Sequence, residues 1–215
     1  MTGSGEACAL ALLALSVGML AGPQATAAAT ACDADLARVQ RRLIELHYPA
    51  GPVDGCPGPR TALAIQAFQR VNRLVSDGTA GPRTLRALRN PRVLRPASRR
   101  RASHIEVDLG HQLLVRVKKR RIVAIYAVST GKRGFETPAG RYRVRRKARR
   151  SWSREYHVWL RWASYFSARG FAIHAGSVRP FAASHGCVRV APEFAPQVYR
   201  AIRVGMPVLI RKLLR

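Results

Sequence analysis

The chain has 215 residues, 47% of them hydrophobic, which is enough to bury a core and excludes wholesale disorder. Its 38 Lys and Arg outnumber its 11 Asp and Glu, which gives a formal net charge of +27 at pH 7. A surface this basic predicts an anionic partner (nucleic acid, a membrane or a wall polymer), unless the excess only reflects a compositional bias towards Arg.

Residues 1–31 are typical of a secretory signal peptide. Residues 7–21 are apolar and uncharged, and small residues with A-x-A cleavage options follow at 25–27 and 29–31. Because no Lys or Arg precedes the apolar run, an uncleaved anchor and a lipid-modified Cys32 stay open as alternatives. We expect an exported protein of the periplasm, cell wall or extracellular face. Export and the lack of a nucleic-acid-binding motif argue against nucleic acid, so wall polymers or phospholipid are the expected anionic partners.

Three cysteines remain once such a signal is removed: Cys32, Cys56 and Cys187. Cys32 and Cys56 lie in the same small N-terminal segment, and exported proteins can pair their cysteines. We predict a Cys32–Cys56 disulfide, which leaves Cys187 as an unpaired thiol. A different pairing, or none, is the alternative.

Residues 32–90 predict a small helical domain. The pattern DGxxGPRT occurs at 54–61 and again at 77–84, where Asp-Gly supplies a tight turn and Pro suits the first turn of a helix. Apolar residues at helical spacing precede the first copy and follow both copies, which indicates three short helices. The three apolar stripes are Leu36, Val39, Leu43 and Leu46; Ala64, Ala67, Phe68 and Val71; and Leu85 and Leu88.

This segment resembles the peptidoglycan-binding type 1 domain. The resemblance lies in LARVQRRLIELHY, in GPVDGCPGPRTALAIQAFQRVNRL and in SDGTAGPRTLRAL, with both turn motifs and the AFQ triplet in register. It implies a three-helix module that docks the glycopeptide of the cell wall.

Residues 91–103 are rich in Pro and Arg, lack periodicity and are typical of a linker. After them the pattern becomes extended, with short apolar or alternating runs separated by turn residues. The predicted strands are 104–109, 113–117, 121–128, 140–144 and 206–210, and a helix is predicted at 193–204. The chain is therefore expected to be an α+β two-domain protein, with a small three-helix module followed by a mainly β domain over 104–215.

The candidate site is the stretch SHGCVRV at 184–190. A thiolate is the nucleophile in cysteine acyl transfer, and a free thiol with a pKa of ~8.5 needs a base beside it. His185, two residues before Cys187, stays open as the base. His174 is favoured, because it follows the short apolar run FAI at 171–173, which predicts a strand, and precedes a loop that can return the chain to the thiol. Gly186 permits an unusual backbone, so that the N–H groups of His185, Gly186 and Cys187 can point at an oxyanion. A satisfied core histidine with a buried thiol is the alternative.

Residues 104–211 resemble the catalytic domain of the L,D-transpeptidases, the YkuD-type family. Three blocks carry the resemblance: VSTGKRGFETPAGRYRV at 128–144, GFAIH at 170–174 and SHGCVR at 184–189. The resemblance implies a β-sandwich-like domain whose cysteine attacks a peptidoglycan stem peptide between its third residue, a diamino acid, and the terminal D-alanine. It further implies a thioester, which a side-chain amine of a neighbouring stem converts into a 3→3 cross-link. Trapping by carbapenem-type β-lactams is also implied.

By position, the resemblance makes Cys187 the nucleophile and His174 its general base. The other matched residues are His185 and Gly186 in the oxyanion environment, Ser184 as the residue that orients the motif, Arg189 as a support of the site or a partner of a substrate carboxylate, and Tyr165 as an aromatic of the donor groove or of the core. The turn residues Thr137, Pro138 and Gly140 are expected to be structural. Ala175 departs from the family, which usually has glycine directly after the base. We expect this departure to leave the chemistry intact and to alter the preference for the donor or acceptor stem.

Two other functions stay open from the sequence. Water in place of the acceptor amine would make the protein an L,D-carboxypeptidase that trims tetrapeptides to tripeptides. A non-catalytic wall-binding protein would rely on the helical module alone, although the intact SHGCVR block argues against a decayed site. No cofactor is expected, and no His, Cys or Asp cluster has the spacing of a metal site. The sequence makes no prediction of the oligomeric state.

Overall fold

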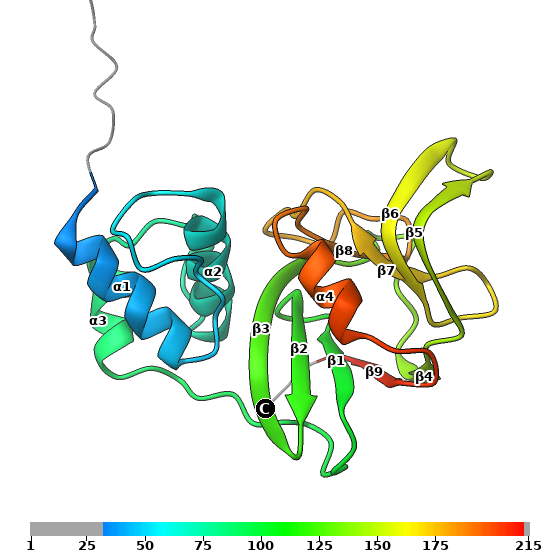
Figure 1. The fold of residues 1–215 in the computed structure, drawn as a ribbon, viewed down its shortest axis with the longest axis horizontal. Coiled ribbons are helices and arrows are strands. Elements are labelled where there is room, and N and C mark those ends of the chain that lie inside the picture. The colour runs from blue at the N-terminus through cyan, green and yellow to red at the C-terminus, as the bar shows by residue number, and fades with distance from the viewer. Residues whose placement is uncertain (1–31, 213–215) are drawn as a thin grey trace, which may run out of the picture.

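The computed structural model describes residues 32–212, so the predicted signal peptide at residues 1–31 lies outside the described residues. A helical module and a mainly β domain lie side by side (Figure 1). In the described part of the chain, no helix combines the length and the apolar character that a membrane span requires.

The helical module contains α1 (Ala34–Glu45), α2 (Pro59–Val71) and α3 (Pro82–Arg89), as the apolar stripes predict. The repeated DGxxGPRT turns are built alike, each around one buried glutamine. Gln40 Nε2 donates to Asp54 Oδ1 at 3.0 Å and to Thr61 Oγ1 at 3.2 Å. Gln69 Nε2 makes the equivalent bonds in the second copy, to Asp77 Oδ1 at 2.7 Å and to Thr84 Oγ1 at 3.0 Å.

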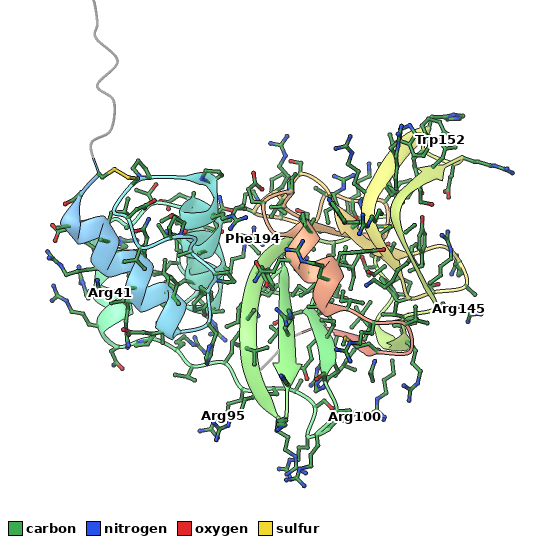
Figure 2. All side chains as sticks on the ribbon, in the orientation of Figure 1. Arg41, Arg95, Arg100, Arg145, Trp152 and Phe194 are labelled. Carbon is green, nitrogen blue, oxygen red and sulfur yellow. A yellow bond between two sulfur atoms is a disulfide. The ribbon has the colours of Figure 1, made fainter. Side chains whose placement is uncertain are left out.

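A disulfide closes the start of this module. It joins Cys32 to Cys56, as the sequence predicts, and its sulfur–sulfur bond is visible at the start of α1 in Figure 2. Asp33 N–H donates to Gly55 O at 2.8 Å beside it, so the first turn of α1 is tied to the first DGxxGPRT turn. Among the described cysteines only Cys187 is a free thiol.

The β domain is built on one sheet, with nine strands in the described residues, ordered β4-β9-β1-β2-β3-β8-β7-β6-β5. The strands are β1 (His104–Asp108), β2 (Leu113–Lys118), β3 (Arg121–Ser129), β4 (Gly140–Arg143), β5 (Arg146–Ser153), β6 (Val158–Tyr165), β7 (Ala172–Ala175), β8 (Val188–Val190) and β9 (Pro207–Arg211). The predicted strands are all present. The sequence reading missed β5, β6 and β8, and it made the last helix too long, because α4 covers only Ala195–Ala201.

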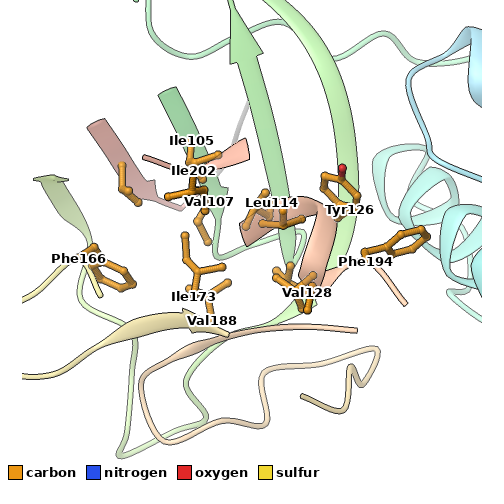
Figure 3. Packing of buried hydrophobic residues seen from close by; sticks show 14 of the residues in the cluster. Ile105, Val107, Leu114, Tyr126, Val128, Phe166, Ile173, Val188, Phe194 and Ile202 are labelled. Carbon is orange, nitrogen blue, oxygen red and sulfur yellow. The ribbon is translucent and has the colours of Figure 1, made fainter. Parts of the chain in front are cut away.

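The sheet curls on itself, which gives the sandwich-like arrangement expected from the sequence. Ile105, Leu114 and Val128 of one half face Ile173 and Val188 of the other across a shared core (Figure 3). Helix α4 closes this core with Phe194, Val198 and Ile202, which are at most 2% exposed. The strands that carry the candidate site, β7 and β8, therefore pack against this shared core through Ile173 and Val188.

The helical module covers the opposite face of β2 and β3. Phe68 and Val71 of α2 belong to the same buried cluster as Val115, Val117 and Ile125. Since Leu114 and Tyr126 face the other core, β2 and β3 bury apolar side chains on both faces, and this accounts for their nearly continuous apolar runs.

The segment between the two units is ordered against β1. The buried carboxylate of Glu106 accepts hydrogen bonds from Ala97 N–H at 2.9 Å and Ser98 N–H at 2.8 Å. The sequence predicts only a linker here, and the structure shows that its middle is fixed to the β domain.

Candidate active site

Cys187 and His174 reach the same cleft because their strands are neighbours. His174 lies in β7, and Cys187 directly precedes β8, which pairs with β7 in parallel so that Ile173 is opposite Val188. The cleft has a volume of about 810 Å³. Its lining includes Ser184, His185, Cys187, Arg189, His174 and Tyr165. These are all the predicted site residues that have a side chain; Gly186 has none.

The backbone at Gly186 fits glycine alone. Its φ is +108°, and a Cβ built there would lie 2.4 Å from Phe171 Cε1. The hydroxyl of Ser184 spans this turn: its O–H donates to Cys187 O at 2.5 Å, and its oxygen accepts from Gly186 N–H at 3.2 Å. Ser184 therefore closes the turn that presents the thiol.

The turn is fastened to the VSTGKRGFETP segment. The N–H groups of Ala183 and Ser184 both donate to Thr130 O at 2.9 Å, and Lys132 N–H donates to Ser184 O at 2.9 Å. Thr137 Oγ1 donates to Gly186 O at 2.8 Å. This contact explains why threonine occurs in the TPAG turn, which has the structural role that the sequence indicates.

His174 is oriented by the carbonyl of the next residue. Its Nδ1 lies 2.7 Å from Ala175 O, and because a carbonyl can only accept, Nδ1 carries the proton and Nε2 keeps its lone pair. A side chain at position 175 does not affect a backbone carbonyl, so Ala175 performs the orienting task of the usual glycine. Burial lowers the pKa of His174, Arg189 also lowers it, and the Ala175 contact opposes them.

The thiol of Cys187 is partly buried, and burial raises its pKa. Ala172 N–H donates to Sγ at 3.4 Å, and this bond and Arg189 favour the thiolate, whereas Glu155 opposes it. Burial thus shifts both groups towards their neutral forms, an imidazole and a thiol. Such a pair needs proton transfer to His174 as the thiol attacks.

The donors available to an oxyanion differ from those expected. Gly186 N–H is directed at Ser184 Oγ, so this glycine acts through its backbone conformation. The N–H groups of His185 and Cys187 have no hydrogen-bond acceptor among residues 32–212. They are the two donors that the turn leaves for a developing negative charge.

The hairpin of β5 and β6 forms one wall of the cleft, and sequence reasoning missed it. It projects from the body of the domain, with Trp152 near its end (Figure 2). Tyr156 at its turn stacks on the His185 ring at 5.0 Å between centroids, and Phe135 contacts the same ring edge-on at 4.8 Å. The aromatic residues at 152, 156, 159 and 162 were the available signal, but their spacings of three and four residues give no period of two that would predict strands.

Tyr165 and Arg189 each have a structural as well as a lining role. Tyr165 is 6% exposed and its hydroxyl donates to Ser151 Oγ at 2.9 Å, while the Arg146 guanidinium lies 3.6 Å from its ring centroid. Arg189 packs so close to Gly176 that a Cβ there would lie 3.0 Å from Arg189 Cγ. Tyr165 is thus buried and also belongs to the lining of the cleft.

In the described residues, no group of three or more His, Cys, Asp or Glu side chains is arranged to hold a metal ion. The side chains that line the cleft include the thiol of Cys187, the imidazole of His174 and the hydroxyl of Ser184. This set is suited to acyl transfer.

Comparison with known families matches both units. The L,D-transpeptidase catalytic domain (YkuD) matches residues 102–210, and a peptidoglycan binding domain matches residues 33–88. The N-acetylmuramoyl-L-alanine amidase CwlM of Mycobacterium tuberculosis is 44% identical over 54 residues, which are 25% of this chain and 13% of that protein.

Solved structures extend the comparison to the whole fold. The L,D-transpeptidase of Xylanimonas cellulosilytica is 29% identical with a TM-score of 0.76, over 84% of this chain and 94% of that one. The L,D-transpeptidase of Stackebrandtia nassauensis is 26% identical with a TM-score of 0.53, over 84% and 92% of the two chains.

Proposed function

The chain belongs to the L,D-transpeptidase family, and from this premise we propose that it uses Cys187 to transfer acyl groups between peptidoglycan stem peptides. The observation that supports the proposal best is the pairing of β7 with β8. This pairing brings into one cleft a thiol and a histidine whose Nε2 keeps its lone pair. The peptidoglycan-binding module beside the cleft supports the same substrate.

In the proposed first half-reaction, the Cys187 thiol gives its proton to His174 Nε2 while Sγ attacks the carbonyl carbon between the diamino acid and the terminal D-alanine. The carbonyl oxygen becomes an oxyanion that the N–H groups of His185 and Cys187 stabilise. When the intermediate collapses, the C–N bond breaks. The proton held by His174 goes to the leaving D-alanine amine, and a thioester on Cys187 remains.

In the second half-reaction, the side-chain amine of a neighbouring stem attacks the thioester carbon and gives a proton to His174. The C–S bond breaks, the thiolate takes back that proton, and a 3→3 cross-link is formed. The arginines of the cleft, Arg146, Arg154, Arg169 and Arg189, provide positive charge for the carboxylates of the stems.

We further propose that the protein acts outside the cytoplasmic membrane, where its substrate is located. The disulfide between Cys32 and Cys56 supports an oxidising compartment. The net charge of +27 supports contact with anionic polymers of the wall or membrane.

The test is mass spectrometry of products after incubation with a disaccharide-tetrapeptide. We expect a cross-linked dimer and free D-alanine with the wild type and neither product with a folded Cys187→Ala variant. Unchanged turnover by Cys187→Ala would contradict the assignment of the nucleophile. Tripeptide monomer alone would make the protein an L,D-carboxypeptidase, and no product together with no carbapenem adduct would favour a wall-binding role.

A further inference from the structure

Arg70 is a charged residue buried where the helical module meets the catalytic domain. It lies near the end of α2 and is 6% exposed. Burial lowers its pKa to about 10, so it stays charged at neutral pH. A buried guanidinium without a carboxylate is costly unless its N–H groups are satisfied by hydrogen bonds.

Three backbone carbonyls of the catalytic domain accept these hydrogen bonds. Nη1 donates to Gln112 O at 2.6 Å and to Val128 O at 2.9 Å, and Nη2 donates to Arg179 O at 2.8 Å. On the side of its own module, Nε donates to Ser76 Oγ at 3.1 Å. The guanidinium thus links α2 to three segments that are far apart in the sequence.

One of these contacts holds the loop between the base and the nucleophile. Residues 176–183 connect β7, which carries His174, to the turn that presents Cys187. Arg179 O takes its bond from Arg70, while Ser129 Oγ accepts from Arg179 N–H at 2.8 Å and lies 2.9 Å from Phe181 O. Hydrogen bonds to Arg70 and to Ser129 therefore both fix this loop.

A second path from Arg70 ends at the same turn. The carbonyl of Gln112 accepts from Arg70, and the side chain of Gln112 accepts from Thr130 N–H at 2.7 Å and donates to Thr130 Oγ1 at 2.8 Å. Thr130 O in turn accepts the N–H groups of Ala183 and Ser184 at 2.9 Å. Both paths converge on the residues that precede Cys187.

We propose that Arg70 is a positioning residue for Cys187, so that the helical module is a structural part of the catalytic site as well as a wall-binding module. The apolar cluster over β2 and β3 already joins the two units, so docking alone does not require a buried charge. Arginine fits the position because its planar fork can donate in several fixed directions, which the single ammonium of lysine cannot do. The proposal rests on the proposed role of Cys187 as the nucleophile.

The test compares the acylation of Cys187 by a carbapenem in four full-length proteins: the wild type, Arg70→Lys, Ser76→Ala and Val71→Ala. Val71 is the matched control, because it is a buried neighbour on α2 in the interface cluster and makes no side-chain hydrogen bond to the catalytic domain. We expect Arg70→Lys to lower the maximal acylation rate about ten-fold or more with little change in the concentration for half-maximal rate. We expect Ser76→Ala to lower it by a few-fold, and Val71→Ala to leave it within about two-fold of the wild type.

Thermal unfolding of each variant separates positioning from loss of stability. An Arg70→Lys protein that is folded and is acylated as fast as the wild type would overturn the proposal, as would a rate that falls equally in Val71→Ala. Should Arg70→Lys fail to fold, Ser76→Ala decides, since a wild-type rate in that variant also contradicts the proposal. If the wild type is neither acylated nor active on the tetrapeptide, the proposed function fails. Alkylation of Cys187 by iodoacetamide, compared across the variants, still tests Arg70 in that case.

Discussion

Strands β2 and β3 differ sharply from strands β5 and β6 of the same sheet. The first pair buries apolar side chains on both faces, between the core of the curled sheet and the helical module. The second pair is exposed or half-buried along most of its length, and guanidinium groups lie over two of its rings: Arg146 over Tyr165, and Arg150 at 3.8 Å from the ring centroid of Trp159.

The two pairs have different tasks at the cleft. The buried pair supports the turn that presents Cys187, because Thr130, directly after β3, accepts the N–H groups before it. The exposed pair contributes a wall on which Trp152 and Tyr156 face the cleft. Buried strands thus support the turn that carries Cys187, whereas strands that water can reach line the cleft.

Removal of the base should have the largest effect. We expect His174→Ala to lower turnover of the tetrapeptide on the order of 10³-fold, because a positioned base typically contributes about 10²–10⁴-fold. The measurement is the rate of D-alanine release, with thermal unfolding as the control for folding. Turnover within ten-fold of the wild type would mean that another group takes the proton.

A substitution at Gly186 tests whether the turn that presents Cys187 must keep its backbone conformation. At Gly186, with a φ of +108° and Phe171 in contact, alanine would displace the turn. We expect Gly186→Ala to lower the acylation rate at least about 100-fold, since a displacement near 1 Å can cost that much. Gly134→Ala is the matched control, because Gly134 also has positive φ but no atom lies within 4 Å of a Cβ built there. Similar losses in both would show that local backbone strain, and not the contact with Phe171, sets the effect.

The free energy of unfolding should fall more for a substitution in β2 and β3 than for one in β5 and β6. Leu114 in β2 is fully buried, so we expect Leu114→Ala to lower the free energy of unfolding by about 2–5 kcal/mol. Trp159 in β6 is 49% exposed, and we expect Trp159→Ala to lower it by about 1 kcal/mol or less. Denaturant unfolding measures both, and equal losses would contradict the distinction between the two strand pairs.

The wall of the cleft should affect substrate binding more than chemistry. Trp152 lines the cleft and Trp159, its partner across the hairpin at 5.2 Å between centroids, does not. We expect Trp152→Ala to raise KM by a few-fold with kcat nearly unchanged, and Trp159→Ala to change KM less. A fall in kcat alone for Trp152→Ala would assign the hairpin to the chemistry instead.

The pH dependence is the smallest expected effect. Because the pKa of His174 is lowered, its imidazole stays neutral below the ordinary value of 6.5, so the acid limb of kcat/KM should lie below pH 6.5. Because the pKa of Cys187 is raised, direct alkylation by iodoacetamide should still increase as the pH passes 9.0. Alkylation that levels off near neutral pH would indicate a preformed thiolate–imidazolium pair.

The sequence alone determined those parts of the structure that depend on residues close together in the chain. The DGxxGPRT turns, the helices after them and the hairpins of β1 to β3 follow from turn chemistry and apolar spacing. The SHGC and GFAIH motifs likewise identified Cys187 and His174 as candidates, because the residue types needed for acyl transfer are local.

Only the tertiary structure decided how these parts meet. The proton position on His174 depends on where Ala175 O points, and Gly186 N–H proved to be used by Ser184. Arg70 reaches Arg179, 109 residues further along the chain. Contacts over such separations depend on the path of the whole chain, and neither composition nor periodicity records that path.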